Sequence, residues 1–374
     1  MNPFINTLKN SALTVAALLS TATVACSQPS APAELKATRK IELANGKSMR
    51  TAALDKFLAQ AMDSAQVPGL SIALINDQKI VYHRSLGVTN AETGEQVNDQ
   101  TIFEAASLSK PIFAYFVLKL VQEGKFDLDK PLYEYLPHPA IAPENAEDYK
   151  LVTSRIVLQH STGFPNWSQG EAIKMSQPPG QGYSYSGEAY QYLAAAVGTH
   201  LGVGYKAGLD SVFQEVVARP LGLQHTRFTW NSYIEQHKAF GHQEGKPTDN
   251  DQQGSAFGAG YSLHTEAADY ARFLIELMRG KHLNEAYRQL MLSEQNPFAP
   301  DNELRETGQT GWSLGLAVRP TEHGTRYLHT GNNHDFMAYC QIYPESGHGL
   351  VIFINSETLE PFYKQLGPFL NDEF

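Results

Sequence analysis

The spacing of hydrophobic and polar residues predicts strands near both ends of the chain and helices between them. Helical spacing is found in Leu54–Ala65, Pro111–Gln122, Tyr190–Leu201, Asp210–Ala218, Thr265–Met278 and Leu359–Leu370. Strand-like apolar runs are found in Leu70–Ile75, Ile80–Leu86, Ser313–Val318, Tyr327–Thr330, Phe336–Tyr343 and Gly349–Asn355. A turn at Asn76-Asp77-Gln78 joins the first two strands into a hairpin.

The short connections between neighbouring strands indicate one antiparallel sheet, because parallel strands need long crossovers. We therefore expect an α+β fold in which strands from both termini form a sheet flanked by helices, with a mostly helical lobe inserted. The sheet region is predicted at about residues 51–106 and 305–374, and the lobe at about 107–304. Together they form a single domain over residues 51–374.

The N-terminal segment predicts export. One basic residue, Lys9, precedes Ser11–Ala25, which is uncharged and shorter than the roughly 20 residues that cross a membrane. Residues 1–25 therefore read as a signal peptide. The sequence Thr23-Val24-Ala25-Cys26 resembles a bacterial lipoprotein cleavage box with Thr23 in place of the usual Leu, so lipidation of Cys26 and ordinary cleavage both stay open. Residues 26–50 are expected to be a flexible tether, and the protein to be periplasmic or lipid-anchored at the bacterial envelope.

Composition excludes several function classes. The chain has 29 Lys and Arg against 39 Asp and Glu, and its net charge of −10 disfavours nucleic-acid binding. Its two cysteines, Cys26 and Cys340, cannot form a disulfide framework, and Cys340 lies in an apolar run typical of a buried thiol. No H-E-x-x-H, C-x-x-C or glycine-rich phosphate loop is present, so no metal or cofactor is expected.

The segment Ser107-Leu108-Ser109-Lys110 is the strongest candidate for chemistry. One helical turn separates Ser107 from Lys110, so the hydroxyl and the amine can meet on one face. A buried lysine can lose its charge and then accept the proton of a serine nucleophile. The Ser107 backbone N–H, at the start of the helix, can stabilise an oxyanion. The alternatives are a capped helix start with a surface Lys110, or a pair between Lys110 and Glu104.

From these residues outward, the chain resembles the serine β-lactamase, DD-peptidase and esterase superfamily, in its class C-like branch. The resemblance is carried by Val117–Pro137, Ile156–Pro165 (IVLQHSTGFP), Glu215–Thr226 and Gly258–Leu274, and it spans about Leu54 to Asn355. It implies that Ser107 is the nucleophile and Lys110 its partner. It also implies a small-molecule or peptide acyl substrate and a covalent acyl-enzyme.

Two further family motifs are present in altered form. Tyr185-Ser186-Gly187 stands where the family has Tyr-x-Asn, so the resemblance implies that Tyr185 shares the proton transfer; ordinary packing is the alternative for this tyrosine. His329-Thr330-Gly331 stands where the family has Lys-Thr-Gly. It implies an edge strand that lines the cleft, and a second oxyanion donor in the N–H of Asn332.

The departures change the substrate that we expect. Gly187 lacks the amide that would hold an acylamide group, and it is expected to open space in the pocket. His329 is a weaker cation than Lys for a substrate carboxylate. We therefore predict an exported serine hydrolase of esters or small amides, a weak β-lactamase at best. The alternative is a penicillin-recognising or peptidoglycan-binding module without turnover.

One competing motif is set aside. Gly311-Trp312-Ser313-Leu314-Gly315 matches G-x-S-x-G, but a nucleophile elbow needs a helix after it. The strand-like residues that follow predict instead that Ser313 lies on a strand of the sheet.

Overall fold

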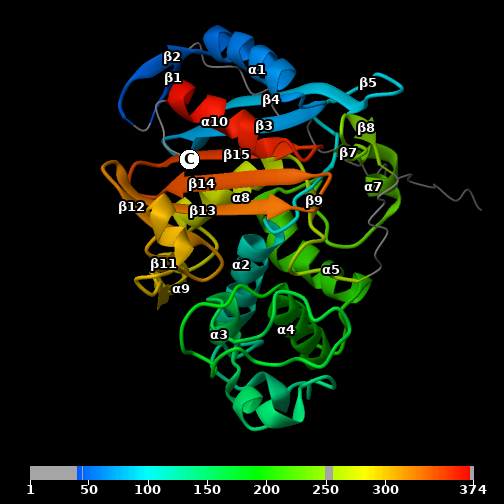
Figure 1. Ribbon diagram of the computed structural model, residues 1–374, viewed down its shortest axis with the longest axis vertical. Coiled ribbons are helices and arrows are strands. Elements are labelled where there is room, and N and C mark those ends of the chain that lie inside the picture. Colours follow the sequence, from blue (N-terminus) through cyan, green and yellow to red (C-terminus); the bar gives the residue numbers. More distant parts are fainter. Residues whose placement is uncertain (1–39, 44, 249–255, 371–374) are drawn as a thin grey trace, which may run out of the picture. The chain divides into compact units, whose positions relative to one another are not determined.

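A nine-stranded antiparallel sheet organises the structure, a computed structural model that describes residues 40–43, 45–248 and 256–370 (Figure 1). Its strand order is β10-β11-β12-β13-β14-β15-β3-β4-β5. The bounds are β3 Gly69–Asn76, β4 Lys79–Asn90, β5 Glu95–Gln96, β10 Asn296–Pro297, β11 Gly311–Trp312, β12 Ala317–Thr321, β13 Gly324–Asn332, β14 Met337–Tyr343 and β15 His348–Ile354. Strand β15 pairs with β3, which joins the two ends of the chain in one sheet. The predicted α+β architecture is confirmed.

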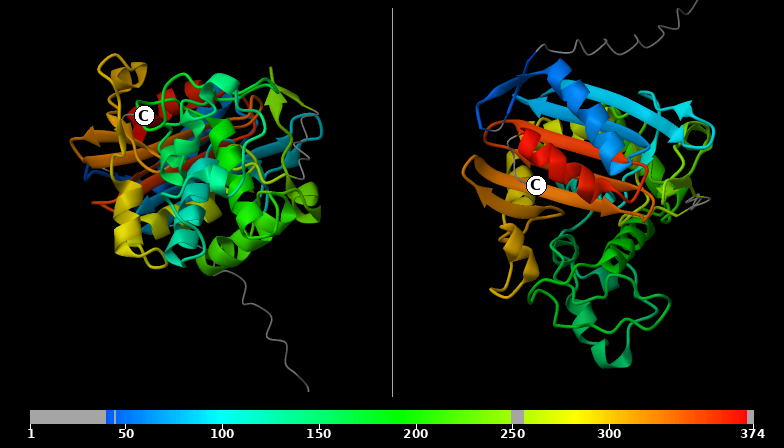
Figure 2. Two further views of the ribbon diagram at one scale, coloured as in Figure 1. Left: turned by 90° about the horizontal axis from the view of Figure 1, so that it is seen from below. Right: turned by 45° about the horizontal axis from the view of Figure 1, so that its top comes forward.

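Helices cover both faces of this sheet. On one face lie α1 (Thr51–Ala65) and α10 (Leu359–Leu370) (Figure 2). Phe57 of α1 stacks on Phe369 of α10 with the ring centroids 3.9 Å apart. On the other face lies α8 (Ala267–Arg279), an amphipathic helix with one side buried against the sheet. Apolar strand residues therefore pack on both sides, which explains why β3 is buried along its whole length.

The helical lobe extends from the second face and is built around α2 (Figure 1). Its helices, with α9, are α2 Ser109–Gln122, α3 Ser154–Leu158, α4 Gly187–His200, α5 Ala207–Phe213, α6 Arg219–Leu221, α7 Ser232–His237 and α9 Glu285–Leu292. A π-helical turn at Gln214–Ala218 continues α5, and 3₁₀ turns lie at Leu132–Glu134, Pro143–Asn145, Asp148–Leu151 and Glu303–Thr307. Short strands pair as β6 (Phe103–Glu104) with β9 (His264–Thr265) and β7 (His242–Gln243) with β8 (Lys246–Pro247).

Three local expectations need correction. Ser313 is not on a strand but in the turn between β11 and β12, where its buried hydroxyl donates to the Leu316 carbonyl at 3.0 Å. Strand β10 lies in a segment that was expected to belong to the helical lobe. The predicted tether is wrong for residues 40–50, because β1 (Lys40–Glu42) and β2 (Ser48–Arg50) form a hairpin. The apolar Ile41 of this hairpin is buried in the core that α1, α10 and the sheet share, which fixes the segment to the domain.

The predicted signal peptide, Cys26 and residues 26–39 lie outside the described residues. Within the described part of the chain, none of the helices has the length and apolar character that crossing a membrane requires. Cys340 is buried in β14, as its apolar surroundings predict.

Candidate active site

Ser107 lies in a tight turn between β6 and α2. The preceding residue, Ala106, has a φ of 48°, a conformation that non-glycine residues rarely adopt and that is found at functional sites. Ser109 fixes this turn through two hydrogen bonds. Its hydroxyl donates to the Ala106 carbonyl at 2.6 Å and accepts from the Leu263 N–H at 3.0 Å. These bonds hold Ser107 at the mouth of a cavity while the rest of the turn is buried.

Lys110 is fully buried beneath Ser107. Its Nζ lies 3.0 Å from the Ser107 hydroxyl and donates to the Gly260 carbonyl at 2.8 Å. No carboxylate of the described residues forms an ion pair with it, and burial lowers its pKa to about 7. Both alternatives for this lysine are therefore wrong: it is not on the surface, and Glu104 pairs with Lys238 instead, at 3.1 Å.

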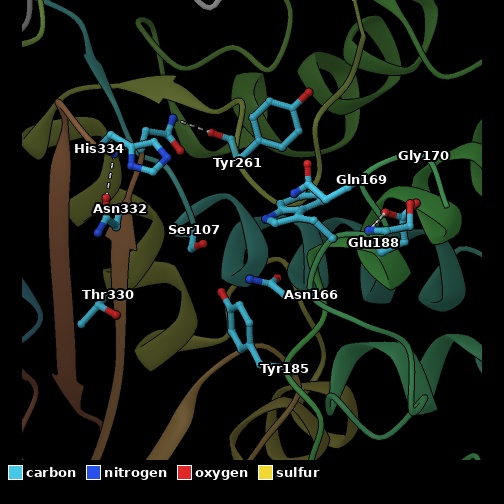
Figure 3. A pocket seen from close by; sticks show the side chains of 13 residues that line it. Ser107, Asn166, Gln169, Gly170, Tyr185, Glu188, Tyr261, Thr330, Asn332 and His334 are labelled. Atoms are coloured by element: carbon cyan, nitrogen blue, oxygen red, sulfur yellow. Dashed lines mark hydrogen bonds between the residues drawn. The ribbon is translucent and has the colours of Figure 1, made fainter. Parts of the chain in front are cut away.

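Tyr185 lies across the cavity from the serine, immediately before helix α4. Its ring covers the Lys110 amine at 4.7 Å from the ring centroid. Burial raises the pKa of its phenol, and the interaction with the Ser107 side chain opposes that shift only in part. The phenol is therefore held in its protonated form. Ser107 and Tyr185 line the same cavity (Figure 3), and Lys110 contacts both of them, so these three side chains converge at one place.

His160 positions this tyrosine. Its buried ring packs against the Tyr185 ring, tilted by 33° with the centroids 4.2 Å apart, and its Nδ1 accepts from the Ser186 N–H at 3.1 Å. Ser186 in turn caps α4 by accepting from the Ala189 N–H at 3.0 Å. Burial, with the nearby Lys110 amine, keeps the pKa of His160 well below its usual range, so the ring is neutral.

Gly187 does not open the pocket as its small size suggested. A Cβ at Gly187 would lie 2.4 Å from the Trp167 ring, so the indole fills the space that a side chain would occupy. The Gly187 N–H is bound by the Asn166 Oδ1 at 2.9 Å. Asn166 and Trp167 follow the family-like stretch that ends at Pro165, and sequence reasoning missed both. The glycine itself was the available signal, because it implies that another group approaches closely.

Strand β13 supplies the opposite wall. Thr330 and Asn332 line the cavity, as expected. Gly331 lies against the nucleophile turn, where a Cβ would meet the Ala105 carbonyl at 2.6 Å, so only glycine allows this approach. His329 is buried, and burial lowers its pKa to about 3, so it is a neutral imidazole rather than a weak cation.

The cavity above Ser107 has a volume of about 720 Å³. Polar side chains dominate its walls: Asn166, Ser168, Gln169, Glu188, Asn332, Asn333 and His334, with Trp167, Tyr185 and Tyr261 (Figure 3). It is large enough for a small-molecule acyl group.

A buried carboxylate links the segment before Ser107 to the end of β13. The Glu104 carboxylate, three residues before Ser107, accepts from the Asn333 side chain at 2.6 Å and pairs with Lys238. Asn333 directly follows Asn332, the expected oxyanion donor. Burial raises the pKa of Glu104, and the charge of Lys238 opposes that shift. Sequence reasoning did not identify Lys238 or Asn333, which lie more than 100 residues from Glu104.

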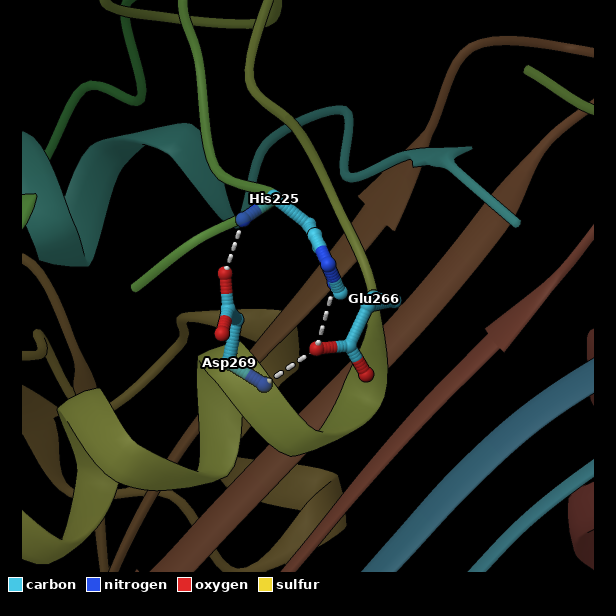
Figure 4. A group of neighbouring side chains, drawn as sticks. All are labelled: His225, Glu266 and Asp269. Atoms are coloured by element: carbon cyan, nitrogen blue, oxygen red, sulfur yellow. Dashed lines mark hydrogen bonds and ion pairs between the residues drawn. The ribbon is translucent and has the colours of Figure 1, made fainter. Parts of the chain in front are cut away.

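A second cluster of titratable groups, His225, Glu266 and Asp269, lies at the start of α8 (Figure 4). Both Glu266 oxygens accept backbone N–H groups, from Ala268 at 2.6 Å and Asp269 at 2.8 Å. Asp269 accepts from the His225 N–H and from Arg272, each at 2.6 Å. Because the carboxylates are committed to capping and to an arginine, the cluster stabilises the helix start and is a poor fit for a metal ion.

The chain is similar in sequence to known hydrolases. The chain is 29% identical over 207 residues to esterase EstB of Burkholderia gladioli, and 28% identical over 241 residues to a putative D-alanyl-D-alanine carboxypeptidase of Escherichia coli. These alignments cover 47% and 56% of this chain, and 51% and 54% of the relatives. The chain thus spans about half the length of these two curated relatives.

Solved structures share the fold at low sequence identity. A penicillin-binding protein homologue from Pyrococcus abyssi, described as octameric, superposes with a TM-score of 0.73 at 21% identity, covering 87% of this chain and 78% of that one. D-alanine carboxypeptidase AmpC from Burkholderia cenocepacia gives 0.69 at 20% identity, with 85% and 100% covered. The family described as Beta-lactamase matches residues 54–372. The chain therefore belongs to the Beta-lactamase family.

Proposed function

We propose that this protein is a serine hydrolase that cleaves esters or small amides through an acyl-enzyme. One observation carries the proposal: the Ser107 hydroxyl lies 3.0 Å from a fully buried lysine that has no carboxylate partner among the described residues. With a pKa of about 7, the Lys110 amine is neutral in a large fraction of molecules at neutral pH. A neutral amine has a lone pair that can accept the hydroxyl proton.

In the first step the Ser107 oxygen bonds to the acyl carbon while its proton passes to Lys110. The carbonyl π electrons become an oxyanion, which the N–H groups of Ser107 and Asn332 stabilise. Collapse of this intermediate restores the carbonyl and breaks the bond to the leaving oxygen or nitrogen. The leaving atom receives a proton from the Tyr185 phenol, which is replenished from Lys110. Water then adds to the acyl-enzyme by the same proton route and releases the acid and free Ser107.

A fluorophosphonate probe tests this assignment. We expect the wild-type protein and the Ser313→Ala variant to be labelled, because Ser313 is buried and bound to the Leu316 carbonyl. Ser107→Ala should lose labelling and lose turnover of phenyl acetate by a factor of about 10³ or more. Labelling that persists in Ser107→Ala and vanishes in Ser313→Ala would refute the proposal.

A second candidate function is a penicillin-recognising or peptidoglycan-binding module without turnover. It is favoured by the two altered motifs, since Gly187 is covered by Trp167 and His329 is neutral. Intact mass after incubation with phenyl acetate, a chromogenic cephalosporin and a D-alanyl-D-alanine peptide separates the two. A stable adduct with no product release supports the module, whereas multiple turnovers support the hydrolase.

We further propose that the protein is exported and that the N-terminal segment directs it to the periplasm or to a lipid anchor at Cys26. The uncharged run before Cys26 supports export. Expression with a labelled fatty acid distinguishes the two fates: incorporation that is lost in Cys26→Ala indicates the anchor, and a mature N-terminus without lipid indicates cleavage alone.

A further inference from the structure

A second cavity adjoins the first. It has a volume of about 570 Å³ and lies under the 3₁₀ turn Glu303–Thr307. Tyr185 and Thr330 line both cavities, so the two meet beside Ser107. A substrate that reacts with Ser107 has two parts, the acyl group and the leaving group. Each of the two cavities can bind one of these parts.

The second cavity has an apolar part, formed by rings and aliphatic side chains. Tyr183, Trp312, Leu304 and Leu328 supply rings and aliphatic surface. The Trp312 N–H and the Nε2 of His329 are buried without a hydrogen-bond partner. Their residues are 5% and 3% exposed, and the His329 Nδ1 donates to the Thr330 carbonyl at 2.6 Å, which leaves its Nε2 as an acceptor. Both nitrogens are covered by neighbouring atoms, so the surface that these two residues offer to the cavity is that of their rings.

The charged side chains that line this cavity are all acidic. Asp301 and Glu303 line its rim with exposed carboxylates. Of the residues that the structure describes, no Lys or Arg lines either cavity. Arg305, in the same turn, does not line the cavity, and its guanidinium donates to the Phe298 carbonyl at 3.1 Å. The rim therefore attracts a cation and repels a carboxylate.

The position of the oxyanion donor indicates which part of the substrate, the acyl group or the leaving group, enters this cavity. Asn332 lines only the first cavity, so the acyl carbonyl points to that side. Tyr185 lines both cavities, and in the proposed mechanism it protonates the leaving atom, which therefore lies where the two cavities meet. The leaving group therefore departs into the second cavity.

Building on the proposed hydrolase function, we propose that the second cavity is a leaving-group subsite for an aromatic or aliphatic body that carries a positive charge. The apolar walls bind the body, and Asp301 and Glu303 attract the charge. Substrates whose leaving group carries a carboxylate, as a D-alanyl peptide does, are disfavoured by the same rim.

The test compares three acetate esters that differ only in the charge on the leaving phenol: phenyl acetate, 3-(trimethylammonio)phenyl acetate and 3-carboxyphenyl acetate. Each kcat/KM is divided by the rate of hydroxide hydrolysis, which removes intrinsic reactivity. We expect the cationic ester to exceed the neutral one by about fivefold to tenfold, and the anionic ester to fall below it. The Asp301→Asn/Glu303→Gln variant should bring the cationic-to-neutral ratio close to one, while Glu306→Gln, in the same turn but outside the cavity lining, should leave it unchanged.

Binding without chemistry separates this proposal from the hydrolase itself. In Ser107→Ala protein, phenyltrimethylammonium should bind more tightly than benzoate in a saturation-transfer NMR titration, and the rim variant should abolish the difference. Equal binding of the two, or a ratio that survives in the rim variant, would overturn the subsite. Failure of every ester to turn over would instead count against the proposed function and leave the binding experiment to decide the subsite.

Discussion

Two buried lysines lie close to Ser107, and they differ in what surrounds the amine. Lys110 is fully buried, touches the Ser107 hydroxyl and the Gly260 carbonyl, and has no carboxylate partner in the described part of the chain. Lys238 is 5% exposed and forms an ion pair with Glu104 at 3.1 Å. The first amine has its pKa lowered to about 7, while the second sits beside a carboxylate whose other oxygen holds Asn333.

The difference teaches how one fold uses the same side chain in two ways. A buried amine with a carboxylate partner keeps its charge and cross-links its surroundings. A buried amine without one is pushed toward the neutral form, and only then can it take a proton from a serine. Here the paired lysine fixes the walls of the site, and the unpaired lysine is placed to act in it.

Replacing the unpaired lysine should have the largest effect on activity. Lys110→Met removes the proton acceptor but keeps the length and apolar packing of the stem. We expect kcat/KM for phenyl acetate to fall by about 10²–10⁴-fold. The melting temperature should stay the same or rise, because no amine is then desolvated in the core.

Steady-state kinetics and a thermal melt on the same preparation check this pair of outcomes. Lys119→Met, on the same helix and bound to the His282 carbonyl away from the site, is the matched control and should keep wild-type activity. A Lys110→Met protein that hydrolyses the ester at the wild-type rate would remove the lysine from the mechanism.

Replacing the paired lysine should act mainly on stability. Lys238→Met leaves the Glu104 carboxylate buried without its cation, at a cost of about 3–5 kcal/mol in the free energy of unfolding. Urea denaturation measures the loss. The double variant Lys238→Met/Glu104→Gln, which no longer buries a lone charge, should recover part of it. If Lys238→Met is as stable as the wild type, the proposed contrast between the two lysines fails.

The sequence predicted the architecture because that depends on periodicity and on short connections. The hairpin turn at Asp77 and Gln78, both with positive φ, follows from a local pattern. The joining of both ends of the chain in one sheet was expected as the most economical arrangement, and the pairing of β15 with β3 achieves it. The errors lie where a short apolar segment could be read in two ways. Ser313 was expected on a strand, and the hairpin around Ile41 was expected to be a flexible tether.

In the site, the S-x-x-K spacing located Ser107 and Lys110, because one helical turn separates them, and the resemblance to the family located Tyr185. Contacts between distant segments could not be predicted from the sequence. The space above Gly187 is closed by Trp167, and neither residue alone reveals the other. Likewise, a buried carboxylate at position 104 gave no sign of which of the chain's cations would pair with it.

Removing the carboxylate beside Lys238 gives the paired lysine surroundings like those of Lys110, and so tests the comparison more sharply. Glu104→Gln keeps an oxygen that can accept from Asn333 but removes the charge beside Lys238. We expect a stability loss of about 1–3 kcal/mol at pH 6. The Lys238 amine then lies in the core without the charge that offsets its desolvation, and this is the source of the loss. Urea melts of the variant and of the wild-type protein measure it. A Glu104→Gln protein that is as stable as the wild type would show that Lys238 does not depend on the carboxylate.

The smallest effect, a tenfold change per pH unit, tests the unpaired lysine most directly. Lys110 with a pKa of about 7 is protonated below that value and cannot accept the serine proton, so kcat/KM should rise tenfold per unit up to about pH 7 and then level off. His329, with a pKa of about 3, and His160, with a pKa held well below its usual range, are neutral throughout this window and cannot produce the rise.

His334 lines the same cavity and carries an imidazole, so His334→Gln must be measured beside the wild type and should keep the rise. Lys238→Met should also keep it, and the residual activity of Lys110→Met should lose it. A rise that disappears in His334→Gln, or that survives in Lys110→Met, would transfer the proton acceptor to another group and end the functional distinction between the two lysines.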